Sequence, residues 1–250
     1  MESTEDTIQL IWTIYGIILL YFLLGGIGFY IINRKKRPDE SRKSYVKFFT
    51  YFIIINVLFA SIVLRPVIFR YLSLVIIGLG SYEIIRLYVH SGYRFGLFFS
   101  YALVVFFLFS FGFYTFSGLP YGLVLYAFLV ASIFDSFSQI TGQLWGHHKI
   151  LPKISPSKTT GGVLGGAVIA VISGFLLRQL YETSIQNRIF LTSGIVLFAF
   201  AGDALASLYK RKYQVKDYSY MIPGHGGVMD RFDSLIACGA WVVFYFYFLK

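Results

Sequence analysis

Residues 189–209 read IFLTSGIVLFAFAGDALASLY, a long run that is apolar apart from its small polar residues and one acid, Asp203. A helix needs about 20 mainly apolar residues to cross the hydrocarbon core of a bilayer. The run does not alternate apolar and polar residues, as the strands of an outer-membrane barrel do. We therefore predict that it forms a transmembrane helix.

Runs of the same kind recur along the chain. We predict an all-α fold, a polytopic integral membrane bundle of about eight transmembrane helices, within a range of seven to nine. We further predict an N-terminal set of helices over 1–118 and a C-terminal region over 119–250 that carries the chemistry. The predicted spans are approximately 8–32, 46–64, 71–89, 95–113, 119–140, 162–177, 189–209 and 235–249.

The composition agrees with this prediction. Hydrophobic residues make up 57% of the chain, and charged residues only 14%, against about 25% in a typical soluble domain. These values exclude a disordered chain, a coiled coil and a disulfide scaffold, and they disfavour a soluble enzyme. The single cysteine, Cys238, supports neither a disulfide nor a cysteine metal site. Acids at Glu2, Glu5 and Asp6 precede the first run, so we expect a permanent span rather than a signal peptide.

The distribution of charge predicts an orientation. The chain has 22 Lys and Arg residues and a net charge of +10. Basic cytoplasmic loops that face anionic lipid account for this charge more simply than nucleic-acid binding does. With the N-terminus outside, 17 of the 22 basic residues lie on the inner side. This orientation places the two most polar loops, 141–161 and 210–234, together on the cytoplasmic face.

Three acids fall within predicted spans, where ionisable groups are costly and usually functional. They are Glu83, Asp135 and Asp203. Arg86 follows Glu83 by three residues on the same helical face, so an ion pair is the simpler interpretation there. Asp135 and Asp203 lie toward the cytoplasmic ends of their spans, and we expect them to reach a polar cavity.

The most informative stretch is 202–234, GDALASLYKRKYQVKDYSYMIPGHGGVMDRFDS. It ends with Asp230 and Asp233, which share a helical face at i, i+3. Carboxylate oxygens without cysteine suit Mg²⁺ rather than zinc. The basic residues between the acids suit an anionic substrate. The glycine-rich turn 223–227 precedes a helix, where backbone N–H groups bind anions. Together these features predict a metal–polyphosphate site.

The same stretch resembles the signature of the phosphatidate cytidylyltransferases, also known as CDP-diacylglycerol synthases. The matching residues stand at the spacings of that family, with Tyr209 as a mild departure. They are Ser207, Lys210-Arg211, Lys216-Asp217, Pro223-Gly224-His225-Gly226-Gly227 and Asp230-Arg231-Phe232-Asp233.

Two further segments resemble the family. One is the upstream loop, with Asp135-Ser136, Gly142, Gly146 and Ser155-Pro156-Ser157-Lys158-Thr159; the other is Glu83-Ile84-Ile85-Arg86-Leu87.

Three positions depart from the family pattern. Gly161 and Ala206 stand where the family commonly has Glu, and Gln143 stands where it often has Lys or Arg. The chain therefore reads like a divergent paralogue. We hypothesise that these changes enlarge or re-charge the head-group pocket and shift the lipid acceptor.

The resemblance implies a reaction of CTP with phosphatidate that gives CDP-diacylglycerol and pyrophosphate. It implies Mg²⁺ on Asp203 and Asp230, with Asp233 as a further ligand or the ligand of a second cation. The implied catalytic residues are Asp203, Asp230, Lys210, Lys216 and His225. The implied substrate-binding residues are Asp135, Ser155, Lys158, Thr159, Ser207, Arg211, Asp217, Gly226, Gly227 and Arg231.

Other interpretations stay open. The acceptor of the same transfer, or of a CTP-dependent kinase-like transfer, can be another lipid phosphate or a polyprenol phosphate. A non-catalytic lipid-binding or transport protein of the same fold is the alternative of a different class. Expected partners are CTP, a lipid phosphate and membrane lipids, without nucleic acid, and the resemblance implies a homodimer. The expected location is the bacterial inner membrane, with the site facing the cytoplasm.

Overall fold

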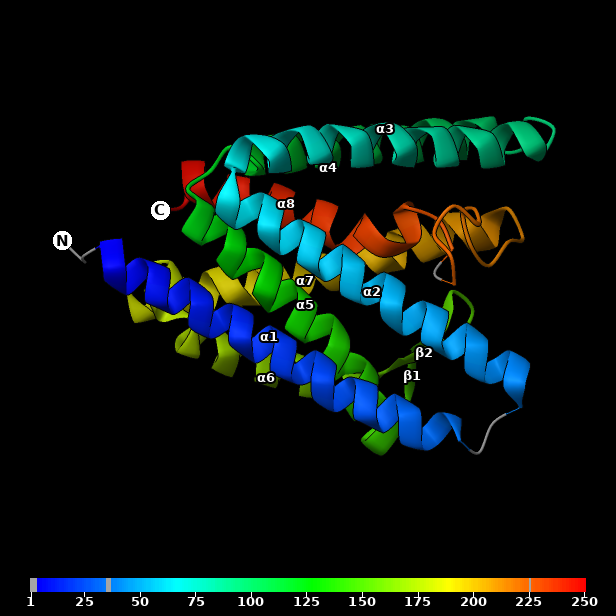
Figure 1. Cartoon of the computed structure of the whole chain (residues 1–250). Coiled ribbons are helices and arrows are strands. Elements are labelled where there is room, and N and C mark those ends of the chain that lie inside the picture. Colours follow the sequence, from blue (N-terminus) through cyan, green and yellow to red (C-terminus); the bar gives the residue numbers. More distant parts are fainter. Residues whose placement is uncertain (1–3, 35–36, 225) are drawn as a thin grey trace.

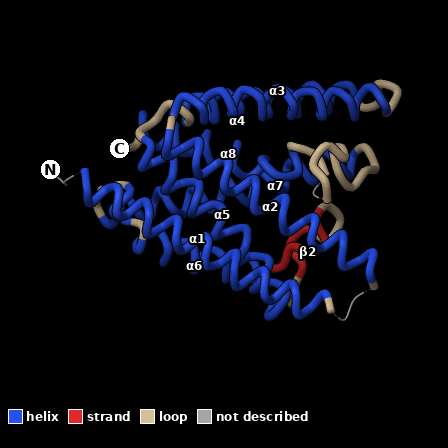
Figure 2. The backbone as a smooth tube through the Cα atoms, viewed as in Figure 1, coloured by secondary structure: helices blue, strands red, loops and turns tan. Residues whose placement is uncertain are grey.

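The computed structural model describes residues 4–34, 37–224 and 226–250, without the side chains of 4–7, 21, 24, 25, 28, 29, 31, 32 and 43. Within these residues the chain forms a bundle of eight α-helices and one small β-hairpin (Figures 1 and 2). The elements are α1 (Thr4–Asn33), α2 (Pro38–Leu64), α3 (Pro66–His90), α4 (Gly96–Phe116), α5 (Tyr121–Trp145), β1 (Lys149–Leu151), β2 (Ser155–Thr159), α6 (Thr160–Leu176), a 3-10 turn (Arg178–Leu180), α7 (Ile185–Lys212) and α8 (Met229–Phe248).

The all-α membrane fold is confirmed, because each predicted span overlaps one of these helices. Of the described helices, five are long and apolar enough to cross a bilayer, namely α2, α3, α4, α5 and α7. Helix α6 is apolar but shorter. The chain is thus an integral membrane protein, whereas the count of eight spans stays a prediction.

Local sequence signals set several helix ends. Pro38 and Pro66 occupy the first turns of α2 and α3, where a missing N–H costs nothing. Arg65 alone separates these two helices and has extended backbone angles, as expected for a residue before proline. The Ser184 hydroxyl caps α7 by accepting a hydrogen bond from the Asn187 N–H at 3.2 Å.

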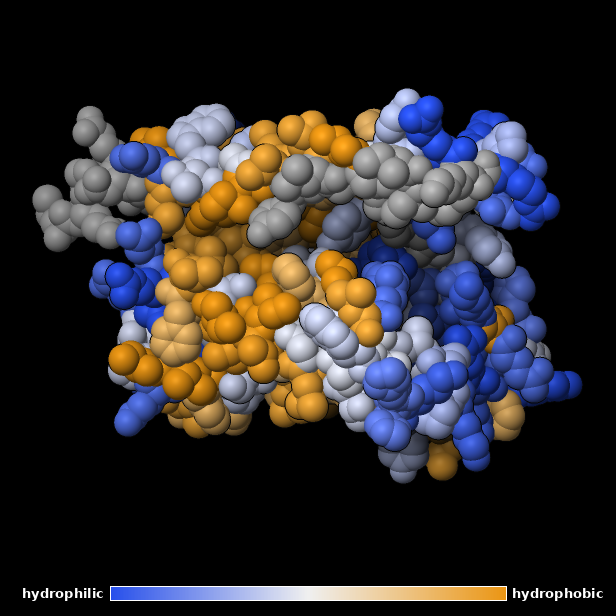
Figure 3. All heavy atoms as spheres, turned by 90° about the horizontal axis from the view of Figure 1, so that it is seen from below, coloured by the Kyte–Doolittle hydropathy of each residue, from blue (hydrophilic) through white to orange (hydrophobic). Residues whose placement is uncertain are grey.

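The polar loops gather at one end of the bundle. The connections after α3, α5 and α7 all lie at the end away from the two chain termini (Figure 1). The Arg211 Nε donates to the Ile154 carbonyl at 3.1 Å and so joins α7 to the loop between the strands. Hydrophilic atoms cover this end and line a hollow there (Figure 3). The prediction that loops 141–161 and 210–234 share one face is confirmed, whereas the side of the membrane stays a prediction.

The β-hairpin was not predicted from the sequence. Strands β1 and β2 are antiparallel, with Lys149 opposite Thr159 and Leu151 opposite Ser155. A strand of three residues is too short for alternation to reveal it. The hairpin brings Lys158, at the end of β2, to the side of α7.

The core lies between α4, α5, α7 and α8. Phe113, Tyr126, Leu191 and Tyr245 are fully buried there. Several buried polar groups make hydrogen bonds between helices, where a bilayer offers no water. The Trp241 Nε1, for example, donates to the Leu191 carbonyl at 3.1 Å and ties α8 to α7.

Candidate functional site

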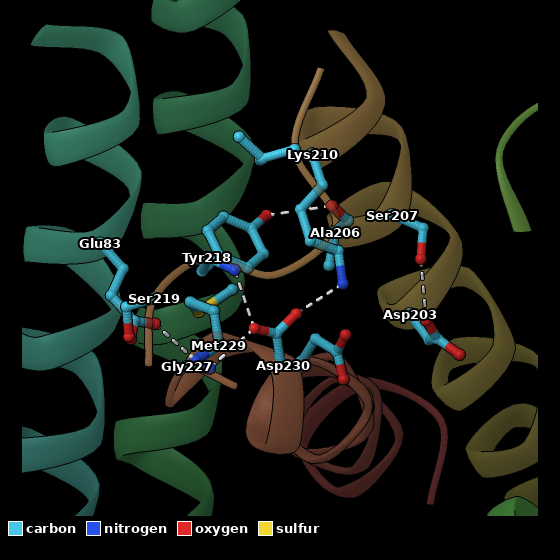
Figure 4. Close-up of polar contacts among 12 residues, drawn as sticks. Glu83, Asp203, Ala206, Ser207, Lys210, Tyr218, Ser219, Gly227, Met229 and Asp230 are labelled. Atoms are coloured by element: carbon cyan, nitrogen blue, oxygen red, sulfur yellow. Dashed lines mark hydrogen bonds and ion pairs between the residues drawn. The ribbon is translucent and has the colours of Figure 1, made fainter. Parts of the chain in front are cut away.

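A fully buried carboxylate from α3 holds the start of α8 (Figure 4). Oε1 of Glu83 accepts hydrogen bonds from the Val228 N–H at 2.9 Å and the Ser219 hydroxyl at 2.5 Å. Oε2 accepts from the Met229 N–H at 2.8 Å. The first N–H groups of a helix have no partner inside it, and they carry the positive end of the helix dipole. Glu83 therefore caps α8.

This finding corrects the prediction for Glu83. The three ion pairs between described residues join other groups, and Glu83 and Arg86 form none. The acid instead reaches across to the glycine-rich loop, and the expected ion pair on one helical face is wrong.

Asp230, in the first turn of α8, is a second anchor for the same loop (Figure 4). Its Oδ1 lies 2.6 Å from the Lys210 Nζ, and both side chains are nearly buried. Its Oδ2 accepts from the N–H groups of Tyr218 and Gly227, both at 2.8 Å. The Asp230 carboxylate thus accepts hydrogen bonds from three donors.

The glycines of the loop make room for these carboxylates. Gly226 has a φ of +84°, a conformation that favours glycine. A Cβ atom at Gly227 would lie only 2.5 Å from Oε1 of Glu83. We expected the N–H groups of this loop to approach a substrate anion. In the structure, those of Gly227, Val228 and Met229 already bind the protein's own carboxylates. His225 lies outside the described residues.

A second lysine–carboxylate pair joins the hairpin to α7. The Lys158 Nζ lies 2.6 Å from Oδ2 of Asp203 and 4.6 Å from the centre of the Phe200 ring. Ser207, one turn further along α7, donates to Oδ1 of Asp203 at 3.1 Å. The Asp203 side chain is 35% exposed and so is open to a ligand. The Thr159 hydroxyl is nearly buried and caps α6 instead of facing this space.

Asp135 and Asp233 complete a polar constellation around Asp203. Asp135 is exposed on α5 and interacts electrostatically with Asp203 and Lys158. Asp233 is nearly buried on α8 and interacts electrostatically with Asp203 and Lys210. The structure therefore brings three of the five predicted site aspartates near one another, namely Asp135, Asp203 and Asp233, and places two lysines beside them.

Other predicted residues lie further out. The Arg211 guanidinium donates to two backbone carbonyls, those of Ile154 and Val215, and so stabilises the loops. Lys216 and Arg231 are exposed, and Ser155 is half-buried on β2. Asp217 packs against the glycine loop, because a Cβ atom at Gly226 would lie 3.2 Å from that of Asp217.

The acids fit a magnesium ion that is shared with a substrate. Within the described residues, no group of three or more His, Cys, Asp or Glu side chains is arranged to hold a metal alone. Mg²⁺ is usually bound by one or two carboxylates together with substrate phosphates. Asp203 and Asp135 fit that pattern. Asp230 fits less well, because its side chain is only 3% exposed, Lys210 binds its Oδ1, and two backbone N–H groups donate to its Oδ2. The bound metal stays a prediction.

Tyr218 is a site residue that the sequence analysis missed. Its ring lies 5.5 Å from the Lys210 Nζ, and its hydroxyl donates to the Ala206 carbonyl at 3.1 Å. Burial raises the pKa of the Tyr218 phenol well above its usual range, so the hydroxyl stays a neutral donor. Its position directly after Lys216-Asp217 in the signature was the available signal.

The structure also bears on the departures from the family pattern. A Cβ atom at Gly161 would lie 2.6 Å from the Trp145 carbonyl oxygen. The Trp145 backbone therefore lies where a side chain at Gly161 would begin, and the hypothesis of an enlarged or re-charged head-group pocket stays a prediction. Ala206 differs, since it lines an apolar cavity of about 210 Å³ together with Tyr218 and Asp233.

A helical membrane bundle with paired lysines and carboxylates at one end agrees with what the comparisons found. Residues 88–249 match the model of the cytidylyltransferase family. Because this match covers more than half of the chain, the protein belongs to that family. The resemblance to the family seen in the signature residues is thereby confirmed.

The curated relatives are phosphatidate cytidylyltransferases. The chain is 35% identical over 133 residues to that of Haemophilus influenzae, covering 51% of this chain and 46% of the relative. It is 40% identical over 121 residues to that of Staphylococcus haemolyticus, covering 48% and 46% respectively. For Staphylococcus aureus the identity is 38% over 123 residues, with coverage of 48% and 46%. The chain spans about half the length of the curated relatives it matches.

Proposed function

We propose that this protein transfers the cytidylyl group of CTP to phosphatidate, giving CDP-diacylglycerol and pyrophosphate. The observation that carries the proposal is the pair of lysine–carboxylate contacts, Lys158–Asp203 and Lys210–Asp230, within the segment that matches the family. A phosphate oxygen of the lipid attacks the α-phosphorus of CTP, and the bond from that phosphorus to the bridging oxygen breaks. Pyrophosphate leaves with the bonding electrons.

The residues of the chain perform this reaction mainly by positioning and charge. The lipid phosphate is already an anion at neutral pH, so the attack needs no general base. Lys158 and Lys210 are held in place by Asp203 and Asp230, and they bind phosphates that enter the site. Because loop amides at 227–229 are bonded to carboxylates, basic side chains supply most of the charge for the substrate. Mg²⁺ on Asp203 and Asp135 would neutralise the negative charge of the triphosphate.

An apolar cavity supports entry of the lipid from the bilayer. Its volume is about 210 Å³, and its walls come from α3, α4, α7 and α8. Tyr101 and Leu205 on these walls are exposed, and Asp233 contributes a carboxylate to the lining. An acyl chain in this cavity would leave its phosphate near Lys210. CTP would arrive from the cytoplasm, which the basic loops of a bacterial inner-membrane protein would face.

Transfer to another lipid phosphate is the second candidate. Ala206 favours it, because an apolar residue lines the cavity at a position where the resemblance to the family leads us to expect Glu. A changed charge at the head group is a direct route to a changed acceptor. This candidate keeps the same chemistry and the same lysine–carboxylate pairs.

The test is product formation by the purified wild-type protein in detergent. We expect pyrophosphate and CDP-diacylglycerol in equal amounts when CTP, Mg²⁺ and phosphatidate are supplied. Polyprenyl phosphate replaces phosphatidate in a parallel reaction and decides between the two candidates. If a folded sample gives no pyrophosphate with either acceptor, the transferase proposal is wrong and a non-catalytic role is favoured.

A further inference from the structure

We infer that Glu83 on α3 is a positioning residue for the transfer site. The inference rests on the proposed function for its catalytic part. Glu83 lies outside residues 88–249, the segment that matches the family. Among the described residues, Glu83 forms no ion pair with Lys158 or Lys210. It is hydrogen-bonded to the loop whose N–H groups bind Asp230, and Asp230 is the partner of Lys210.

The loop donates hydrogen bonds to the carboxylates of Asp230 and Glu83 at two places. At each place one residue donates to Asp230 and the next residue donates to Glu83. At the first place, Tyr218 donates its N–H to Asp230 and the next residue, Ser219, donates its hydroxyl to Glu83. At the second, Gly227 donates its N–H to Asp230 and the next residue, Val228, donates to Glu83. The described residues of the segment 218–229 are thus clamped between one acid from α3 and one from α8.

The clamp is sensitive to the loss of either acid. Glu83 is fully buried and accepts from three donors, two of them backbone N–H groups at the start of α8. A buried donor left without its acceptor loses far more than a typical hydrogen bond is worth. The loop also has no room to move closer to α3, because Gly227 packs directly on the Glu83 carboxylate. Loss of Glu83 therefore frees the loop rather than shifting it slightly.

The link to the site is Asp230. Among the described residues, its Oδ2 is bonded only to the clamped segment, and its Oδ1 holds the Lys210 ammonium at 2.6 Å. A loop that moves away from α3 withdraws the Tyr218 and Gly227 N–H groups from Asp230. The Asp230 carboxylate then turns, and Lys210 loses its fixed position. Glu83 thus acts on Lys210 indirectly, through the loop and through Asp230.

The experiment compares Glu83→Gln and Glu83→Asp with Ser73→Ala, a control on the same helix that is equally buried. Gln offers one acceptor oxygen and points an NH₂ group at donors. In Glu83→Gln we expect amide hydrogen exchange over 218–230 to become at least tenfold faster. Lys210 should react faster with an amine-reactive reagent, whereas exposed Lys153 should not change. Glu83→Asp should fall between Gln and wild type.

Turnover supplies the catalytic readout. We expect kcat of Glu83→Gln to fall at least tenfold, with KM for CTP within threefold of wild type and Ser73→Ala unchanged. If Glu83→Gln does not fold, Ser219→Ala removes one donor and should show a smaller increase in exchange.

Unchanged exchange over 218–230 in every folded Glu83 variant overturns the inference. Faster exchange with unchanged Lys210 reactivity overturns the link to the site. If wild type gives no turnover, the proposed function fails, and exchange and Lys210 reactivity still decide whether Glu83 positions Lys210.

Discussion

The Lys210–Asp230 pair should couple strongly in a double-mutant cycle. Its two charged atoms lie 2.6 Å apart, and the side chains are only 11% and 3% exposed. Removal of one member of a buried pair leaves an uncompensated charge and costs about 3–5 kcal/mol. Lys210→Met and Asp230→Asn should each cost about that much. The double variant removes both charges, so we expect a coupling energy of about 2–3 kcal/mol.

The chain carries its own reporter for this measurement. Cys238 is its single cysteine and is completely buried in α8. A thiol-reactive fluorescent dye therefore reacts only when α8 leaves the bundle. Unfolding of the detergent-solubilised wild type, both single variants and the double variant gives the four free energies of the cycle.

The Lys158–Asp203 pair provides the matched control. The distance is the same, 2.6 Å, but the side chains are 17% and 35% exposed. An exposed pair is screened by water and contributes about 0–1 kcal/mol. We expect a coupling energy below about 1 kcal/mol for Lys158→Met with Asp203→Asn. A coupling energy for Lys210–Asp230 no larger than that of the control would refute the argument from burial.

Two further predictions follow from the loop and the topology. Gly227→Ala should lower both turnover and the melting temperature in the dye assay, because its Cβ atom would lie 2.5 Å from Oε1 of Glu83; Gly78→Ala, with nothing within 4 Å, should not. Normal melting of Gly227→Ala would show that the loop is free to move. Cysteines placed at Lys153 and Lys216 in a Cys238→Ala background should react only from the cytoplasm; labelling of intact cells by an impermeant reagent from outside would contradict the orientation.

The sequence predicted the helices well because a helix that crosses a membrane needs a long apolar run, which is visible in the sequence. It predicted their ends less well. Helix α2 begins at Pro38, eight residues before the predicted span, because polar residues continue the helix beyond the apolar region. The hairpin of β1 and β2 was missed, since its strands are too short to carry a pattern.

The candidate site was predicted in part. The signature residues indicated where Asp203, Lys210 and Asp230 gather, because they lie close together in the sequence. The clamp by Glu83 was out of reach, because Glu83 and Ser219 are 136 positions apart. The i, i+3 spacing on one helix predicted that Glu83 pairs with Arg86. In the fold, the buried Glu83 instead accepts hydrogen bonds from N–H groups at the start of α8, which have no partner inside their own helix.

The most direct test of the central claim is turnover of Asp203→Asn in purified form, at matched folding and monodispersity. Asp203 is a partly exposed carboxylate of the constellation, and it lies beside Lys158 and Ser207. A lost metal ligand should raise the barrier by about 4 kcal/mol, which is roughly a thousandfold in rate. Asp39→Asn, the same change at an exposed position on α2, should leave Mg²⁺-dependent pyrophosphate release unaltered. Release by Asp203→Asn near the wild-type rate would contradict a transfer site built on Asp203.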